Sequence, residues 1–140
     1  MPTVLKTSAP AHVAPLDLAF YHGAAFPPDA AGDLFVTWHG SWNADPPVGR
    51  KVVRLRRGPD GLPLLLEPLL EYAGPGDVAA DWPHRPVGLA VDAAGRLLVT
   101  SDASGVVLAV GYDPQVPLVP PVLAGSGGPR RFDCALSSWR

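Results

Sequence analysis

Glycine and proline interrupt this sequence so often that it has little room for helices. The chain has 15 Gly and 18 Pro among its 140 residues, and its longest internal stretch without either is 96–104. An ordinary helix averages about 11 to 12 residues and is destabilised by both residues in its interior. Because 47% of the residues are hydrophobic, a packed core is expected. The composition therefore excludes a helical bundle and predicts short strands joined by turns.

Short apolar or alternating segments, each bounded by turn residues, predict seven strands. These segments are 16–21, 33–38, 51–56, 64–70, 87–91, 96–100 and 106–112. The tripeptide 59–61, Pro-Asp-Gly, predicts a hairpin loop, because Pro presets one central dihedral angle and Gly accepts a positive φ. The sequence thus predicts an all-β fold.

Two parts of the chain resemble each other. An Ala-Ala-Gly turn at 30–32 leads into Leu-x-Val-Thr at 34–37, and the same two features recur 63 residues later, at 93–95 and 97–100. Repeated units of several strands are typical of β-propeller blades. The repeat predicts about two blades, and a chance match of short turns is the alternative.

The repeat also predicts the domain organisation. Residues 1–112 would form two blades, with insertions at 41–48 and 67–85, and residues 113–140 would form an irregular, disordered tail rich in Pro and Gly. A propeller uses at least about four blades, and each blade buries its faces against its neighbours. Two blades alone leave apolar faces exposed. We therefore expect this chain to be the end piece of a longer protein, or to associate with other copies.

Charge and cysteine content narrow the classes of partner. The 11 Lys and Arg against 13 Asp and Glu give a net charge of −2, without the basic excess that nucleic-acid binding requires. The single cysteine, Cys134, allows no internal disulfide and no multi-cysteine zinc site. Prolines interrupt the first 20 residues, and no apolar run approaches the ~20 residues that cross a bilayer. We expect no nucleic-acid partner, no membrane span and no signal peptide in this chain.

The most distinctive polar segment is 39–43, His-Gly-Ser-Trp-Asn, at the end of a predicted strand. It combines an imidazole, a hydroxyl, an indole and an amide with a glycine that allows close backbone approach. Such a segment is suited to ligand binding. The alternative is structural, with Trp38 and Trp42 as packing aromatics and His39 as a loop histidine.

Other motifs for catalysis or metal binding are absent. Four aspartates, Asp77, Asp81, Asp92 and Asp102, lack the spacing of a calcium-binding loop and are expected to be turn carboxylates. The sequence has no HxxxH pair, no GxSxG and no phosphate-binding GxxxxGK[ST]. Hydrolase and nucleotide-binding functions are therefore not indicated.

Six segments, in order and with compatible spacing, resemble landmarks of the glucose/sorbosone dehydrogenase family. They are 11–21, 26–27, 32–36, 39–43, 51–54 and 85–91. That family consists of quinoproteins, six-bladed propeller sugar dehydrogenases that depend on pyrroloquinoline quinone (PQQ). The resemblance implies a partial six-bladed propeller, corresponding to about its last two blades.

The resemblance also implies a function and a site. The function would be oxidation of an aldose or sorbosone at C1 by hydride transfer to PQQ, with a small sugar as substrate and an external electron acceptor. PQQ carries three carboxylates, and Arg85 matches an arginine that holds this cofactor in the family. His39 and Asn43 would be further cofactor contacts. The catalytic histidine base and the Ca²⁺ ligands are expected outside this chain, and the family implies a periplasmic or secreted location.

Three positions depart from the family pattern. Ala44 stands where Arg is usual, Asp17 where Gly is usual and Arg50 where Tyr is common. Loss of an arginine beside an anionic cofactor would weaken its binding. The alternative function, which the missing blades favour, is a truncated, non-catalytic propeller remnant that acts as a binding or assembly module. The segment 39–43 does not favour a third class, the metal-dependent lactonases.

Overall fold

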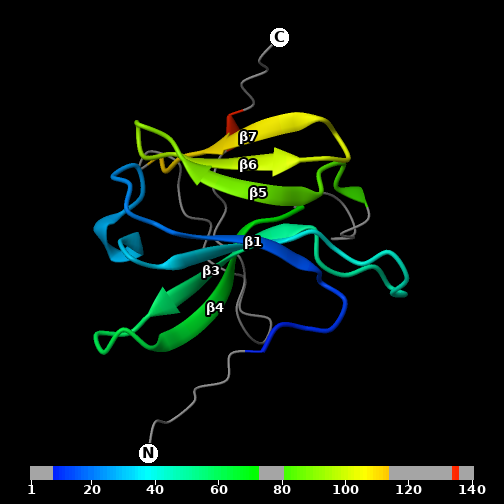
Figure 1. Cartoon of the computed structure of the whole chain (residues 1–140), viewed down its shortest axis with the longest axis horizontal. Coiled ribbons are helices and arrows are strands. Elements are labelled where there is room, and N and C mark those ends of the chain that lie inside the picture. The colour runs from blue at the N-terminus through cyan, green and yellow to red at the C-terminus, as the bar shows by residue number, and fades with distance from the viewer. Residues whose placement is uncertain (1–7, 73–80, 114–133, 136–140) are drawn as a thin grey trace, which may run out of the picture.

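The computed structural model describes residues 8–72, 81–113 and 134–135. In this part of the chain the protein is built from two four-stranded antiparallel sheets, ordered β1-β2-β3-β4 and β5-β6-β7-β8 (Figure 1). The elements are β1 (Pro15–Phe20), a 3-10 turn η1 (Pro28–Ala30), β2 (Leu34–Trp38), β3 (Lys51–Arg57), β4 (Pro63–Leu70), β5 (Pro86–Val91), β6 (Leu97–Ser101), β7 (Val106–Val110) and β8 (Cys134–Ala135). We call β1–β4 the first blade and β5–β8 the second blade.

All seven predicted strands are present, with ends that differ by one or two residues. The predicted hairpin at 59–61 joins β3 to β4, where the amide of Gly61 donates to the carbonyl of Gly58 and the amide of Gly58 to the carbonyl of Leu62. Gly61 has φ +76°, the conformation for which the turn needs glycine. Local turn chemistry and apolar alternation therefore determine most of the secondary structure.

The eighth strand differs from the expectation of an irregular tail. Cys134 and Ala135 pair with Val110 and Ala109 of β7 and complete the second sheet. A two-residue strand carries no periodic pattern that a sequence could reveal, and it exists because an exposed strand edge offers unpaired backbone groups. The remaining tail residues, 114–133 and 136–140, lie outside the described residues.

The sequence repeat corresponds to a repeat in strand register. Leu18 of β1 pairs with Val36 of β2, and Leu89 of β5 pairs with Val99 of β6. Both first strands carry an irregularity at the same point, between Pro15 and Leu18 in one and between Pro86 and Leu89 in the other. The two sheets are therefore equivalent units, which confirms the predicted blades.

The main core lies between the two blades, at a contact that we call the seam. Its buried residues come from both sheets and from the loops that follow β1 and precede β5: Tyr21, Phe26, Ala30, Phe35, Val52, Leu69, Leu70, Trp82, Leu97, Val99, Leu108 and Val110. Three of these rings pack together, since the centroid of Tyr21 lies 4.7 Å from that of Phe26 and 5.5 Å from that of Phe35. Burial of this apolar surface holds the blades face to face.

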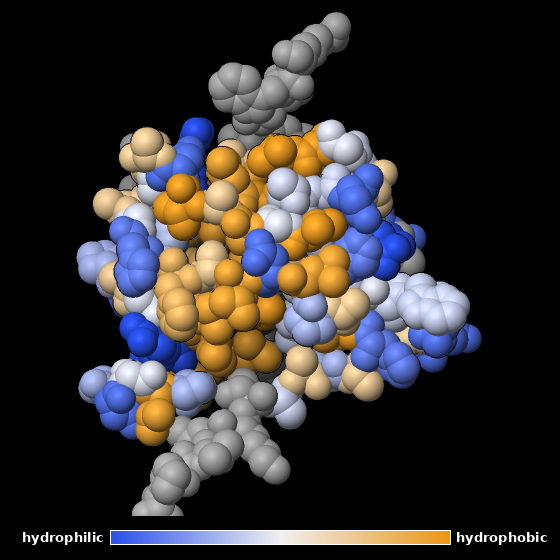
Figure 2. Space-filling view, in the orientation of Figure 1, coloured by the Kyte–Doolittle hydropathy of each residue, from blue (hydrophilic) through white to orange (hydrophobic). Residues whose placement is uncertain are grey.

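The face of the first blade that points away from the seam is also apolar. A smaller cluster of Val13, Trp38 and Val53 is buried there, while Leu18 and Phe20 on β1 remain half exposed. Figure 2 shows apolar surface over β1, the strand that carries both residues, and this surface continues across the seam over β5 of the second blade. This chain therefore exposes the kind of surface that a neighbouring blade would cover, as the two-blade prediction expected.

Candidate functional site

Two of the predicted site residues meet at one end of the seam. His39 follows β2 of the first blade, and Arg85 precedes β5 of the second. The guanidinium of Arg85 donates from Nε to the carbonyl of His39 at 3.3 Å and from Nη2 to the carbonyl of Gly40 at 3.0 Å. Blade stacking thus joins residues that are 46 apart in the sequence.

The imidazole of His39 is held by the second blade. Its Nδ1 lies 3.2 Å from the carbonyl oxygen of Pro86. Because a carbonyl only accepts, Nδ1 must carry the proton in this contact. Nε2 lies 3.8 Å from a carboxylate oxygen of Asp102, and the His39 side chain is 16% exposed while that of Asp102 is 60% exposed. The orientation of the ring is therefore set by Pro86, and its other nitrogen lies nearest Asp102.

A second imidazole, that of His84, belongs to a hydrogen-bonded chain beside Arg85. Ser101 Oγ accepts the backbone amide of Arg85 at 2.9 Å and the hydroxyl of Ser104 at 2.8 Å. Since the Ser104 hydroxyl proton is used there, its oxygen accepts from His84 Nδ1 at 2.7 Å. Partial burial lowers the pKa of His84. This chain positions the backbone of Arg85 and keeps the lone pair of His84 on Nε2.

The loop 41–48 leaves the site after Gly40. Its base is closed by the amide of Ser41 on the carbonyl of Val48 at 2.8 Å and by the amide of Val48 on Ser41 Oγ at 3.0 Å. Gly49 at φ +88° lies so close to Gly40 that a Cβ would come within 2.5 Å of the Gly40 Cα. The close approach that the glycine-containing motif suggests is therefore real, and it is made to another part of the backbone.

The structure separates the residues of the predicted motif. Trp38 is buried, as the packing alternative expects, whereas Trp42 is 88% exposed. Asn43 is also exposed, and none of the hydrogen bonds of His39 and Arg85 within the described residues is made to it. The geometry brings His39 and Arg85 together and leaves Asn43 in the exposed loop.

Sequence reasoning missed four residues of this cluster. Asp102, His84 and the serines of β6 and its following turn lie beside the predicted pair. The repeat contains the signal for one of them, because Asp102 occupies the position 63 residues after His39. The histidine and serines lack a local pattern and became neighbours only through the β6–β7 turn.

Two of the departures from the family pattern make contacts across the seam. Asp17 Oδ2 accepts the amide of Leu89 at 2.8 Å, and Arg50 Nη1 donates to the carbonyl of Trp82 at 3.0 Å. Both side chains therefore connect the two blades in this protein. Ala44 is half-buried in the loop 41–48, and nothing in the structure explains that departure.

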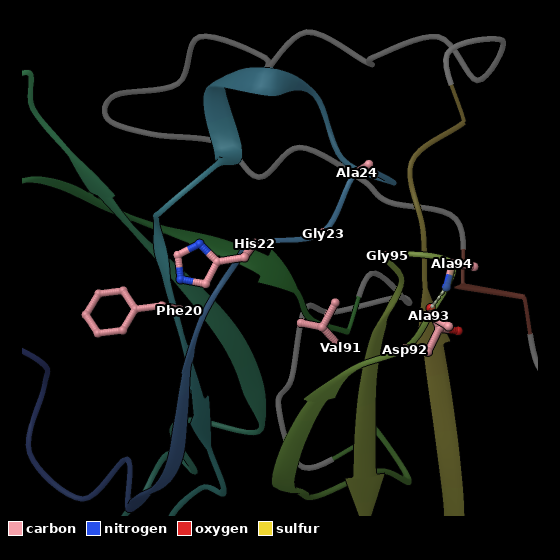
Figure 3. A pocket seen from close by; sticks show the side chains of 9 residues that line it. All are labelled: Phe20, His22, Gly23, Ala24, Val91, Asp92, Ala93, Ala94 and Gly95. Atoms are coloured by element: carbon pink, nitrogen blue, oxygen red, sulfur yellow. Dashed lines mark hydrogen bonds between the residues drawn. The ribbon is translucent and has the colours of Figure 1, made fainter.

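A depression of about 460 Å³ lies at the opposite end of the inner strands, between the β1–η1 loop and the β5–β6 turn (Figure 3). It is lined by Phe20, His22, Gly23, Ala24, Val91, Asp92, Ala93, Ala94 and Gly95. The Asp92 carboxylate accepts backbone amides of Arg96 and Ala94, and the Arg96 amide is the main cause of its lowered pKa. Asp92 is thus a turn carboxylate, as expected, and the depression is distinct from the His39 cluster.

Within 8–72, 81–113 and 134–135, no group of three or more His, Cys, Asp or Glu side chains could hold a metal ion. The same part of the chain has no helix of the length and hydropathy that a bilayer crossing needs.

The fold and the site together define a pair of adjacent β-propeller blades with a polar cluster at one end of their seam. Residues 3–113 match the TrAA12-like family model. The chain therefore belongs to the TrAA12-like family. This match confirms, at the level of the family, the predicted likeness to PQQ-dependent sugar dehydrogenases.

Two solved structures show the same fold. One is the calcium structure of the Trichoderma reesei carbohydrate-active enzyme of family AA12, which is 29% identical, has a TM-score of 0.53 and matches over 69% of this chain and 24% of its own. The other is the holo form of the pyranose dehydrogenase PQQ domain from Coprinopsis cinerea, which is 33% identical, has a TM-score of 0.51 and matches over 72% of this chain and 27% of its own. The chain spans about a quarter of each.

A curated relative covers a shorter region. An uncharacterized protein of Borreliella burgdorferi is 52% identical over 46 residues, which are 33% of this chain and 12% of that protein. Because its function is not described, this match extends the set of related sequences and adds nothing about chemistry.

Proposed function

We propose that this chain forms part of the PQQ site of a quinoprotein sugar dehydrogenase that oxidises an aldose or sorbosone at C1. The observation that carries the proposal is the pairing of Arg85 with His39 at one end of the seam, on different blades. Family membership and the likeness to a pyranose dehydrogenase PQQ domain support it. The sugar, an external electron acceptor and a location outside the cytoplasm are parts of the same proposal.

The donors of the cluster are suited to an anionic cofactor. Arg85 uses two of its five N–H groups on the carbonyls of His39 and Gly40. In the described part of the chain its other three N–H groups have no partner, and a guanidinium binds a carboxylate through two parallel hydrogen bonds. PQQ, which has three carboxylates, would supply the hydride-accepting quinone. The residues present fit this group.

Each side chain has a separate part in the proposed site. The carbonyls of His39 and Gly40 fix the Arg85 guanidinium, so that little conformational entropy is lost when it binds an anion. His39 presents Nε2, since Nδ1 is held by Pro86, and Asn43 offers its amide from the exposed loop. The catalytic base and the Ca²⁺ ligands would lie outside this chain.

Titration of the full chain with PQQ tests the proposal, with quenching of tryptophan fluorescence as the readout. The R85A variant should bind PQQ more weakly by about 1 to 3 kcal/mol, which is about 5-fold to 150-fold in Kd, because a charge-assisted hydrogen-bond pair is lost. The Kd of the R85K variant should lie between those of the wild type and R85A, because lysine keeps the charge but lacks the planar guanidinium that binds a carboxylate through two hydrogen bonds.

The matched control is R96A. Arg96 lies at the other end of the second blade, where it pairs with Asp92, so this variant should bind PQQ like the wild type. An unchanged Kd for R85A would remove Arg85 from the site. Absence of saturable quenching in the wild-type chain would overturn the proposal for this chain as a whole.

A second candidate function is a non-catalytic binding or assembly module. The exposed apolar face of the first blade favours it, because large apolar surfaces on soluble chains commonly mark interaction sites. The two functions differ in the PQQ titration, since only the first requires that Arg85 affect the affinity.

A further inference from the structure

The seam inside this chain shows how one blade recognises the next. Thr37 on β2 accepts the amide of Asp17 at 2.9 Å and donates its hydroxyl proton to the carbonyl of Val87 on β5 at 2.8 Å. One hydroxyl therefore connects the β1 irregularity to the inner strand of the neighbouring blade. Thr37 is fully buried by this contact.

The second blade carries the equivalent of the Thr37 hydroxyl on its face away from the seam. Thr100 lies 63 residues after Thr37 and accepts the amide of Gly88 at 2.8 Å, in the position of Asp17. Among the described residues, the Thr100 hydroxyl has no acceptor for its proton, and its side chain is exposed. The second blade thus presents an unused Thr hydroxyl on the face away from the seam.

The first blade carries the equivalent of the carbonyl of Val87, which accepts the hydrogen bond from Thr37. Leu16 lies 71 residues before Val87 and occupies its place in the irregularity of the inner strand, between the paired positions Pro15 and Leu18. The carbonyl of Leu16 is therefore the counterpart of the carbonyl that accepts from Thr37. Leu16 is exposed, so this counterpart has no blade against it in the described structure.

The same equivalence extends over both outer faces. We call the face of the first blade that points away from the seam the first outer face, and the corresponding face of the second blade the second outer face. By register, the first outer face carries counterparts of seam residues of the second blade: Leu18 for Leu89, Leu34 for Leu97, Val36 for Val99 and Val53 for Leu108. The second outer face carries counterparts of seam residues of the first blade: Ala90 for Ala19, Leu98 for Phe35, Thr100 for Thr37 and Val107 for Val52.

We propose that the first outer face of one chain binds the second outer face of a second copy, head to tail, with the Thr100 hydroxyl on the Leu16 carbonyl. The occupant is a second copy because this chain carries both complementary halves of a contact that it already makes internally. The interface is heterologous, so the dimer keeps one first outer face open on one copy and one second outer face open on the other, and association continues beyond the dimer unless the chain of copies closes into a ring.

Sedimentation velocity on the full chain, from micromolar to near-millimolar concentration, tests this proposal. The wild type should form dimers and larger species as concentration rises. L18E places a charge on the first outer face, where Leu18 is 58% exposed, and V107E does so on the second, where Val107 is 41% exposed. Each variant alone should remain monomeric, because a buried unpaired charge opposes association.

Mixing the two variants gives the decisive result. L18E keeps an intact second outer face and V107E keeps an intact first outer face, so an equal mixture should form a one-to-one dimer and stop there. A symmetric interface would instead leave at least one variant able to pair with itself. Formation of the mixed dimer also shows that both variants are folded.

Two further variants complete the test. L62E carries the same substitution at an exposed residue of the β3–β4 hairpin, away from both outer faces, and should associate like the wild type. T100V removes the hydroxyl with little change of shape and should raise the dissociation constant of the self-association about threefold to tenfold. Any of three results would overturn the proposal: a wild type that stays monomeric, a mixture of L18E and V107E that stays monomeric, or an L62E variant that fails to associate, as L18E and V107E do. The outer faces would then be binding sites for blades of another polypeptide.

Discussion

At the scale of single residues, hydrogen bonds across the seam give several side chains roles that their types do not reveal. Tyr21 donates its hydroxyl to the carbonyl of Gly95 at 2.6 Å and accepts the amides of Ala25 at 3.0 Å and Phe26 at 2.9 Å. A buried tyrosine hydroxyl requires such partners, because an unpaired one costs about 1 to 3 kcal/mol. This one side chain holds the β5–β6 turn against the loop that follows β1.

His84 is the residue from which a pH effect is expected. Partial burial places its pKa below the ordinary value, so the folded state favours the neutral ring. As the pH falls through about 6.5, the unfolded chain takes up this proton before the folded chain does, and the free energy of unfolding decreases. Denaturant unfolding at about pH 7.5 and pH 5.5 should show this decrease in the wild type.

The contribution of His84 is isolated by substitution. H84N keeps a donor toward Ser104 and should show a smaller loss of stability between the two pH values than the wild type. H22N changes an exposed histidine at the other end of the molecule, and its free energy of unfolding should decrease between the two pH values by as much as that of the wild type. Equal pH dependence in H84N and the wild type would contradict the assignment.

At the scale of elements, the β5–β6 turn of the second blade packs against the loop that follows β1 of the first blade. Gly95, in the β5–β6 turn, has φ +83°, and a Cβ there would lie 2.6 Å from the amide nitrogen of Ala24. Gly105, in the β6–β7 turn, has φ +66° and open space where its Cβ would be. The two glycines therefore share a backbone conformation and differ in their surroundings.

This difference predicts unequal costs for the same substitution. G105A should lower the free energy of unfolding by about 1 kcal/mol, the cost of a positive φ for alanine. G95A should lower the free energy of unfolding by at least about 2 kcal/mol, because the β1–η1 loop must also move to make room for the methyl group. Chemical denaturation of both variants measures the difference, and equal losses would show that the loops accommodate the methyl group.

At the scale of the whole molecule, one core joins both sheets, so they should unfold together. Phe35 is completely buried at the seam, whereas Phe20 is half exposed on β1. F35A should lower the free energy of unfolding by about 3 to 5 kcal/mol, and F20A by much less. Thermal unfolding at a concentration where the chain is monomeric should show one transition for the wild type, and two separate transitions would mean that the blades are independent.

The secondary structure and the repeat could be predicted because their causes are local. Alternation of apolar residues specifies strands, and Pro-Asp-Gly or Ala-Ala-Gly specifies the turns between them. The two-residue β8 has no such pattern, and its pairing with β7 depends on an edge that exists only in the folded sheet. The family resemblance assigned Arg85 and His39 to one site, whereas the contact between them depends on how the blades stack, and the position of Asn43 depends on the path of a loop with little local pattern.

The sequence by itself determined that this chain forms two equivalent antiparallel units, because apolar alternation and turn residues act over a few neighbours. Only the tertiary structure decided which residues meet at the seam. Tyr21 bonds Gly95 across 74 residues, and Arg85 bonds His39 across 46, because stacking of the blades buries apolar faces and aligns their ends. The same physics leaves an apolar face of the first blade open, since a face can be buried only by a partner that the local sequence does not specify.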